Sequence, residues 1–349
     1  MNLNYLLIFV PIAFALDQYG AGPIVVFVMS SLAIIPLCEL IGKSTERIAE
    51  SLGPTIGGLL NATMGNVPEL IIGIFALKNG LQSIVKASIA GSLLGNLLCV
   101  LGVAMLAGGI RHRVQKFNVR MAGVNSMLLI LAAIGLIIPA VFHFSTADTN
   151  DQIGVEISVI LFLAYLASLI FTLVTHQQTF SEGEPEKLDP SRSPSRARIG
   201  RAVVVLAVST IVLAVMSESL TGSIEPLSKK LGLTSAFAGI FLLATVGNIS
   251  SLINAVQYAI KDKMDLTIAT TLGAGTQVAL LVAPVLVFAS YLLGTPMDLH
   301  FSRFEVIAIA LAVFVGRQLT VDGESTWLEG ILLVAVYAML GVGFYYLKG

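Results

Sequence analysis

The sequence predicts an all-α polytopic membrane protein with about eleven transmembrane helices. Of its 349 residues 56% are hydrophobic and only 12% are charged, and the mean hydropathy is +0.90. A soluble domain usually carries about 25% charged residues. Apolar stretches close to the roughly 20 residues that a spanning helix needs recur along the whole chain. A further observation, an internal repeat, predicts how these helices are organised.

Each apolar stretch predicts one spanning helix. The first, in MNLNYLLIFVPIAFAL, lacks a positive n-region and a small-residue cleavage site, so we interpret it as a span and not as a signal peptide. The spans are predicted near 4–20, 22–42, 54–77, 83–107, 119–142, 153–175, 201–224, 235–260, 264–293, 303–320 and 327–347.

The distribution of Lys and Arg predicts the orientation in the membrane. Fourteen of the twenty basic residues fall in loops on one face and six on the other, and the richer face is expected to be cytoplasmic. The N-terminus is then cytoplasmic and the C-terminus outside. We expect a multi-pass protein of a prokaryotic inner membrane, with the lipid bilayer as its surroundings.

Other function classes find little support in the sequence. The net charge of −1 gives no basic field for nucleic acid. Cys38 and Cys99 are two lone cysteines in apolar segments, which form neither a disulfide framework nor a zinc pattern. No Walker loop, HExxH or GxSxG motif is present. We therefore expect a protein that is not an enzyme and needs no cofactor.

An internal repeat divides the chain. The segment 38–53 aligns with 217–232 at an offset of 179, and 64–71 aligns with 246–253 at an offset of 182. The prediction is a leading helix (1–20), a first five-helix repeat (21–175), a charged cytoplasmic linker (176–200) and a second five-helix repeat (201–349). Because five is odd, the repeats are inverted, as in secondary transporters with a site near the bilayer midplane.

The motif GNVPE (65–69) lies inside an apolar span and carries the first candidate site. Gly65 permits unusual backbone angles, and Pro68 removes a backbone donor and frees carbonyl groups. Asn66 and Glu69 are three residues apart and share one helix face. A carboxylate in mid-membrane is costly and is a functional candidate by default. Such oxygen ligands suit Ca²⁺ or an alkali cation, and the carboxylate can hold a proton in turn.

The second copy, GNISS (247–251), keeps the asparagine but not the acid, because Ser251 stands opposite Glu69. The polar side chains of this copy and of neighbouring spans are candidate cation ligands, although each could equally form an interhelical hydrogen bond. They are Ser92, Asn96, Asn248, Ser250, Ser251 and Gln277. Glu39 and Glu218 are repeat partners at the ends of apolar runs and are candidate acids of access paths from opposite faces.

These motifs resemble those of the calcium/proton exchangers of the cation exchanger family. The resemblance lies in segments 34–80 and 85–102 of the first half and in 217–248 and 261–287 of the second. It implies two inverted five-helix repeats and exchange of Ca²⁺ for protons, with Asn66 and Glu69 as the first-signature ligands. The second signature of that family has an acid and a histidine, where this chain has Ser251 and Leu252. Ala274 also replaces a serine of the family.

The sequence therefore predicts a cation/proton antiporter in which Glu69 binds cation or proton alternately, with Asn66, Asn248 and Ser251 as further ligands. Ca²⁺ is favoured as the transported cation. Three alternatives remain open. The loss of the acid at Ser251 could favour Na⁺ or K⁺, or the chain could be a non-exchanging scaffold that acts as an ion sensor or partner subunit. A passive channel is the third.

Overall fold

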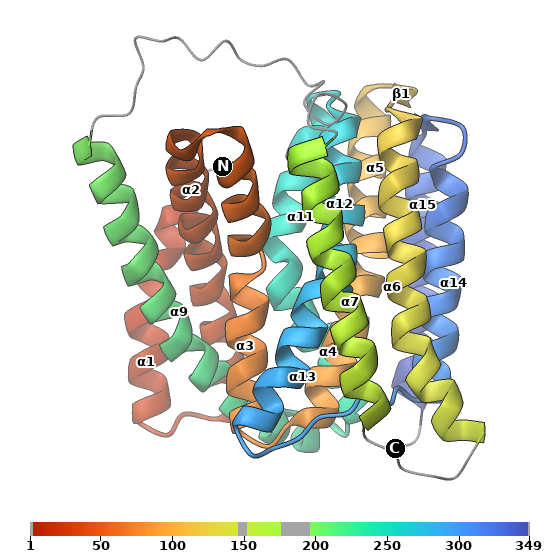
Figure 1. Cartoon of the computed structure of the whole chain (residues 1–349). Helices are drawn as coiled ribbons and strands as arrows, with labels where there is room; N and C mark the ends of the chain where they lie inside the picture. Colours follow the sequence, from red (N-terminus) through yellow and green to blue (C-terminus); the bar gives the residue numbers. More distant parts are fainter. Residues whose placement is uncertain (1–2, 146–151, 176–195, 348–349) are drawn as a thin grey trace. The chain divides into compact units, whose positions relative to one another are not determined.

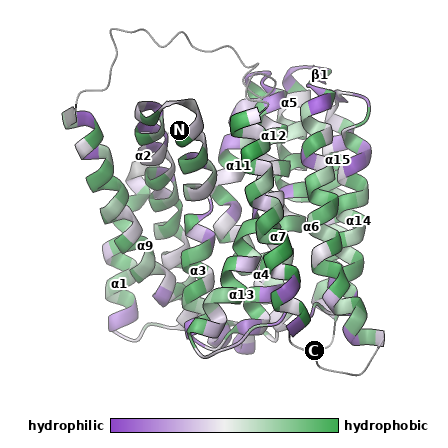
Figure 2. Ribbon diagram, in the orientation of Figure 1, coloured by the Kyte–Doolittle hydropathy of each residue, from purple (hydrophilic) through white to green (hydrophobic). Residues whose placement is uncertain are grey.

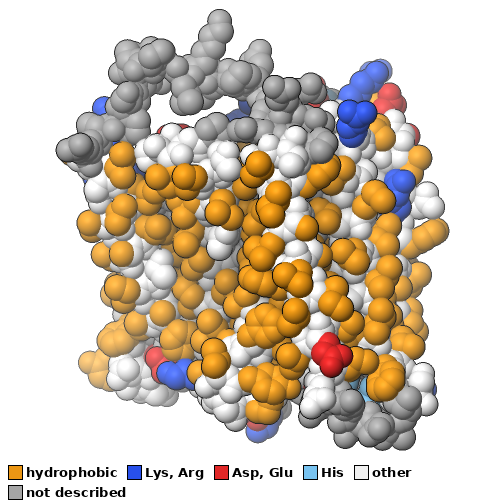
Figure 3. All heavy atoms as spheres, in the orientation of Figure 1, with side chains coloured by type: hydrophobic (Ala, Val, Ile, Leu, Met, Phe, Trp, Pro, Cys, Tyr) orange, Lys and Arg blue, Asp and Glu red, His pale blue; other side chains and the backbone are white. Residues whose placement is uncertain are grey.

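The computed structural model describes residues 3–145, 152–175 and 196–347, and most of these residues are helical. Within them, nine helices are long and apolar enough to cross a membrane. The predicted spans 4–20 and 303–320 correspond to shorter helices, Tyr5–Gln18 and α14 (Arg303–Leu319). The helices are hydrophobic along most of their length (Figure 2). Hydrophobic side chains cover most of the face drawn in Figure 3, and the few charged ones lie mainly toward its ends.

In chain order the helices of the first half are η1 (Leu3–Ile8), α1 (Phe9–Gln18), α2 (Pro23–Met64), α3 (Val67–Lys78), α4 (Gln82–Leu94), η2 (Gly95–Val100), α5 (Leu101–Arg111), α6 (Val119–Ser145), α7 (Gln152–Ile170) and η3 (Phe171–Thr175). Those of the second half are α9 (Arg196–Leu231), α10 (Ser235–Phe237), η5 (Ala238–Leu243), α11 (Ala244–Ile260), α12 (Met264–Gln277), η6 (Val278–Val282), α13 (Ala283–Leu292), α14 and α15 (Trp327–Tyr346). Two short antiparallel strands, β1 (Gln115–Lys116) and β2 (Glu324–Ser325), pair Gln115 with Ser325.

The helices form two compact units that differ from the predicted repeats. Unit 1 comprises residues 1–75 and 165–227, and unit 2 comprises 76–164 and 228–349. Each unit contains segments of both predicted repeats, because the repeats reflect sequence similarity and the units reflect packing. Most of the predicted linker, positions 176–195, lies outside the described residues, and positions 196–200 already belong to α9.

Unit 1 is held together by contacts around α2. Helix α1 packs along α2, and the hydroxyl of Thr55 donates to the carbonyl of Leu173 at 3.4 Å. The hydroxyl of Ser219 on α9 donates to the carboxylate of Asp17 at 2.6 Å, beside the end of α1. These bonds join segments that are distant in the sequence and satisfy polar groups that would otherwise face an apolar medium.

Unit 2 is a tightly packed group of helices. Helix α5 packs against α11 and α15, α6 packs against α12 and α14, and α4 packs against η5. Helix α14 lies beside α6 and also contacts α15 (Figure 1). Four leucines of α4 and η2 are completely buried: Leu93, Leu94, Leu97 and Leu98. This group forms much of the apolar core of the unit.

The repeat recurs in the backbone as well as in the sequence. Gly53 and its repeat partner Gly232 both have positive φ, at 80° and 67°. At the second offset Gly80 has φ 73° and Asp262 has φ 58°. The π-helical segment η6 begins 182 positions after Asn96 of η2. Some turns and one helix irregularity therefore occupy equivalent places in both copies.

Some helices extend beyond the predicted spans. Helix α2 continues past position 42 to a kink at Gly53, and α9 continues past position 224 to Leu231. The added turns are rich in charged and small residues, which form helix readily once the chain has left the apolar region. The glycines with positive φ end these extensions, because L-residues rarely adopt that conformation.

Gly91 and its repeat partner Gly273 provide a matched test of the packing of unit 2. A Cβ at Gly91 would lie 2.4 Å from the Cα of Ile240, whereas one at Gly273 would meet nothing within 4 Å. Gly91→Ala should lower stability by about 1–3 kcal/mol through overpacking. Gly273→Ala should raise it by up to about 1 kcal/mol through helix propensity. Thermal denaturation in detergent measures both, and equal effects would contradict the close α4–η5 contact.

Candidate functional site

The GNVPE motif interrupts the helix as predicted. Helix α2 ends at Met64, Gly65 and Asn66 form a turn, and α3 begins at Val67. The backbone N–H of Asn66 donates to the carbonyl of Thr63 at 3.3 Å. This bond reaches back three residues, whereas an α-helical bond reaches back four. Pro68 has no N–H to offer the carbonyl of Met64. The carbonyl of Met64 therefore lacks the N–H that a regular helix would supply, at a helix break inside the span Thr55–Lys78.

Glu69 lies in the first turn of α3, immediately after this break. Its side chain is half-buried, and Oε2 is shielded from solvent with no hydrogen-bond partner among the described residues. The side-chain amide of Asn66 is buried and donates to the carbonyl of Ala62 at 3.0 Å. Gly65 is exposed. The start of a helix favours a negative charge. The arrangement gives an acid and several oxygen atoms that a cation or a proton could use.

Cys38 is a neighbour of Glu69 that the sequence treated only as a small buried side chain. It lies on α2, buried, and close enough for the Glu69 carboxylate to act electrostatically on its thiol. No local sequence signal could have found this proximity, because Cys38 and Glu69 lie 31 positions apart in the chain.

Unit 2 brings three of the predicted residues together. The amide of Asn96 donates to the carbonyl of Ser92 at 2.9 Å and to Oδ1 of Asn248 at 3.1 Å. The amide of Asn248 donates to the same Ser92 carbonyl at 3.4 Å. All three side chains are buried, and Asn96 is completely so. Because both amide hydrogens of Asn96 are used, its Oδ1 is held in a fixed orientation, and among the described residues it has no hydrogen-bond partner.

The second copy of the motif differs from the first in its backbone. Residues 247–251 lie within an unbroken α11. At the offset of 182 Ser250 stands opposite Pro68, and unlike proline it can donate its N–H to the helix. Ser250 and Ser251 are half-buried on this helix, and Gln277 is half-buried at the end of α12. The structure shows no bond from either serine to Asn248.

The two candidate access-path acids lie in unit 1 in unlike settings. Glu39 pairs with Lys43 one turn along α2 and is largely shielded. Glu218 on α9 is exposed, and its neighbour Ser219 bonds to Asp17 near the end of α1. At the offset of 179 Gly222 stands where Lys43 stands in the first copy. Glu39 is therefore matched by a cation on its own helix, and the corresponding position beside Glu218 carries no charge.

The donor atoms decide what these residues could bind. In the described ranges no three His, Cys, Asp or Glu side chains lie together as a metal cluster. The available groups are one carboxylate, amide and hydroxyl oxygens, and backbone carbonyls. These hard oxygen ligands suit Ca²⁺ or an alkali cation, and they do not suit copper or zinc.

Comparison with known proteins identifies the family. The model of the sodium/calcium exchanger protein family matches residues 22–174 and 201–346. The chain belongs to this family. The matched segments cover both predicted repeats and leave out the linker between them, which agrees with the predicted resemblance to calcium/proton exchangers.

Curated relatives and solved structures share nearly the whole chain. A "Ca(2+)/H(+) antiporter" of Aphanothece halophytica is 41% identical over 355 residues, covering 98% of this chain and 95% of the relative. The "Ca(2+)/H(+) antiporter ChaA" of Bacillus subtilis is 39% identical, covering 93% and 92%. The structure of native YfkE matches with a TM-score of 0.85 and 35% identity, covering 99% and 100%. An H⁺/Ca²⁺ exchanger CAX, at 12% identity and a TM-score of 0.74, shares the fold.

The Asn96–Asn248 contact can be measured by a double-mutant cycle. Asn248→Ala removes the acceptor of one Asn96 hydrogen and should cost about 1–3 kcal/mol, because the donor is left buried and unsatisfied. Asn96→Ala should cost a similar amount. The double variant should be more stable than the sum of both losses predicts, by about 0.5–3 kcal/mol. Unfolding in detergent gives these values, and strict additivity would show that the two amides do not interact.

Proposed function

We propose that this protein exchanges Ca²⁺ for protons across a membrane. Membership of the sodium/calcium exchanger family and relatives named Ca²⁺/H⁺ antiporters at 41% and 39% identity support this function. The observation that carries it is Glu69, an acid at a helix break whose Oε2 is shielded and lacks a hydrogen-bond partner among the described residues. A carboxylate in that setting gains by binding either a cation or a proton.

Competition for one carboxylate couples the two ions. When Ca²⁺ is bound, Glu69 is ionised, and when Ca²⁺ leaves, the carboxylate takes up a proton because an unpaired charge in an apolar medium is costly. Exchange then requires only that the binding site open to each face in turn. Asn66 and the carbonyl groups around Gly65 are the proposed neutral ligands beside Glu69.

The polar side chains of unit 2 are proposed as cation ligands as well. Oδ1 of Asn96 is the strongest candidate, because hydrogen bonds of the side-chain amide fix its orientation and no described residue donates a hydrogen bond to it. Ser92 and Asn248 hold this oxygen in place. Ser250, Ser251 and Gln277 stay predictions from the sequence, as does the joint binding of one cation by these side chains and Glu69. Glu39 and Glu218 likewise stay predicted access-path acids.

The missing second acid favours a second candidate, exchange of Na⁺ or K⁺. One carboxylate leaves Ca²⁺ with a net charge of +1, whereas it neutralises a monovalent ion. Ser251 stands where a second carboxylate would complete the charge balance. Ca²⁺ remains the first proposal, because carbonyl and amide oxygens are ordinary Ca²⁺ ligands. A non-exchanging sensor or partner subunit and a passive channel are the remaining alternatives.

We further propose a prokaryotic inner membrane as the location, with the N-terminus in the cytoplasm. The excess of Lys and Arg in the loops of one face supports this orientation. On this basis the α13–α14 connection faces the outside, and β1 and β2 face the cytoplasm.

Proton flux in liposomes tests the function directly. The purified protein is reconstituted with a pH dye inside, a proton gradient is imposed, and Ca²⁺, Na⁺ and K⁺ are added separately. Proton flux in response to Ca²⁺ is expected. A response to Na⁺ or K⁺ alone would replace the first proposal by the second. Silence with all three ions, in a folded protein, would favour the non-exchanging alternative.

Glu69→Gln should abolish coupling of cation and proton. An amide cannot exchange a proton for a cation, so we expect exchange to fall on the order of 100-fold, the scale of loss of a proton-transfer group. Glu156→Gln makes the same change at an exposed glutamate of α7 and should leave the rate unchanged. Both variants should remain monodisperse in detergent. Wild-type exchange by a folded Glu69→Gln variant would eliminate the proposed role.

Ser251→Glu tests whether α11 faces the cation. A second carboxylate within about 4 Å would attract Ca²⁺ by several kcal/mol at an intermediate dielectric constant, so Ca²⁺ affinity should rise at least about tenfold. The matched control is Ser251→Gln, which introduces a side chain of the same size without the charge and should have little effect. Calcium binding by isothermal titration measures the difference. Equal affinities in the two variants would show that position 251 points away from the cation.

A further inference from the structure

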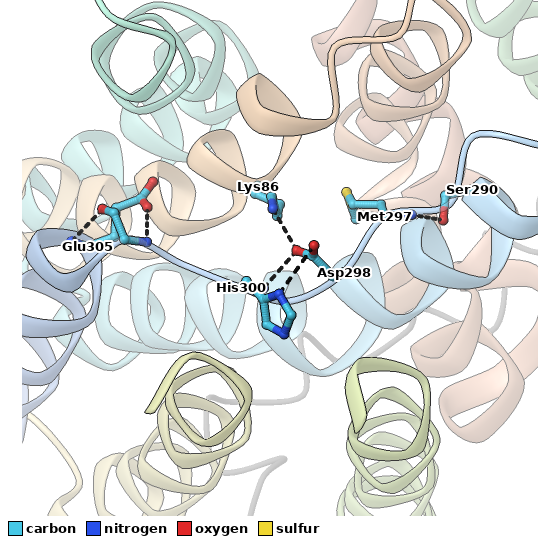
Figure 4. A network of polar contacts seen from close by, with 7 residues as sticks. Lys86, Ser290, Met297, Asp298, His300 and Glu305 are labelled. Atoms are coloured by element: carbon cyan, nitrogen blue, oxygen red, sulfur yellow. Dashed lines mark hydrogen bonds and ion pairs between the residues drawn. The ribbon is translucent and has the colours of Figure 1, made fainter. Parts of the chain in front are cut away.

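A cluster of ionisable side chains lies at one end of unit 2, apart from the candidate cation ligands. It comprises Lys86 on α4, His143 near the end of α6, and Asp298 and His300 in the α13–α14 connection (293–302). Figure 4 shows Lys86, Asp298 and His300 pointing toward one another. Lys86 Nζ donates to Asp298 Oδ1 at 2.6 Å, and His300 Nδ1 lies 3.3 Å from Asp298 Oδ2. We call these four residues the histidine cluster.

Asp298 is the anion on which the cluster depends. Its carboxylate also accepts the backbone N–H of His300 at 2.9 Å, so both oxygens have partners. Burial by itself would raise the pKa of Asp298, but the hydrogen bond and charge of Lys86, together with His300, hold it below its usual value. Asp298 therefore stays ionised through the pH range in which histidines titrate.

The two histidines stack on each other. Their ring centroids are 4.5 Å apart and the planes differ by 21°. Nδ1 of His143 is shielded from solvent and has no hydrogen-bond partner among the described residues. A proton on that atom would be a buried donor without an acceptor, in face-to-face contact with a second ring that can also carry charge.

Charge balance limits the cluster to one histidine proton. Lys86 already neutralises Asp298, so a proton on His300 brings the net charge to +1 and a second on His143 brings it to +2. The first is tolerated because His300 contacts the carboxylate directly. The second is opposed by stacking of like charges and by the missing acceptor at His143.

Among the residues that the structure describes, the neighbouring charged groups do not relieve this imbalance. Arg303 on α14 lies 5.3 Å from the ring centre of Phe144 and adds a further positive charge. Glu305 is occupied in the cap of α14, where it accepts the backbone N–H of Ser302 at 2.7 Å. On α7, which approaches the connection at Gly154 near Leu299, the nearest acid in sequence is Glu156, and it is exposed.

We propose that the histidine cluster is a proton-operated latch that holds the α13–α14 connection against the end of α6 and releases it when both histidines are charged. The open form binds more protons than the stacked form, so lowering the pH favours opening. Because a histidine gains its charge on protonation, acidification drives the transition. Nothing in this step needs a ligand other than protons.

The latch is connected to the candidate site through α4. Asp298 fixes Lys86 in the first turns of the helix that continues to Ser92 and into η2 at Asn96. Opening therefore loosens the support of that helix. Given the proposed exchange function and orientation, we expect acidification of the outer face to slow exchange. This would limit proton entry when the outside is acidic.

Hydrogen exchange measures the latch without relying on transport. Amide protection of residues 293–302 is compared near pH 7.5 and pH 5.5, on either side of the histidine range, after correction for intrinsic rates. In the wild type, protection should fall about tenfold at the lower pH, the effect of one pKa unit of proton linkage. In His143→Phe, which keeps a stacking ring and cannot be protonated, protection should not change. The control is His112→Phe. His112 lies between α5 and α6, at the opposite end of α6 from His143, so this variant should behave as the wild type.

Flux measurements test the functional consequence. With the inner pH held constant, the wild-type rate should fall at least about threefold as the outer pH drops below the histidine range, and His143→Phe should lose this fall. His143→Gln is the second variant if the phenylalanine variant is unstable. Equal pH responses of wild type and variants in hydrogen exchange would overturn the latch. If the protein exchanges no Ca²⁺ for protons at any pH but its amide protection still responds to pH, the proposed function would be overturned and the latch would stand.

Discussion

The structure depends on one constraint, which is that backbone and charged groups inside a bilayer must find partners within the protein. No water is available there to replace a missing hydrogen bond, so spanning segments are helices that satisfy their own backbone. A departure from regular helix is therefore informative. The turn at Gly65 and Asn66 is such a departure, and Glu69 lies in the first turn of the helix that follows it.

The same constraint explains the buried amides of unit 2. Asn96 is completely buried, and its two hydrogens are used by Ser92 and Asn248. The close approach of α4 and η5 at Gly91 and Gly239 brings backbones together where larger residues would collide. Small residues at such crossings are common in membrane proteins, because packing replaces the hydrophobic driving force between helices. Tight packing and fixed amides thus hold the oxygen of Asn96 in one orientation.

Charged side chains away from the candidate site have hydrogen-bond partners in distant segments. Lys86 and Asp298 are 212 positions apart, and Gln115 reaches Asp262 at 2.8 Å across a separation of 147. These contacts fasten the connections at the two ends of the unit, where helices leave the apolar region. Ionisable groups at such places remain accessible to protons, which gives the fold a means of responding to pH that is separate from ion binding.

The sequence by itself determined the class of the protein, the approximate spans, the interruption at Pro68 and the repeat, because hydropathy, the missing N–H of proline and polar similarity are local properties. The alignment paired Gly53 with Gly232, and the structure adds that both have positive φ. Tertiary structure alone decided that the compact units combine parts of both repeats, that Cys38 lies near Glu69, and that His143 stacks on His300. These features arise from packing between segments far apart in the chain, and no local pattern encodes which side chains such packing brings together.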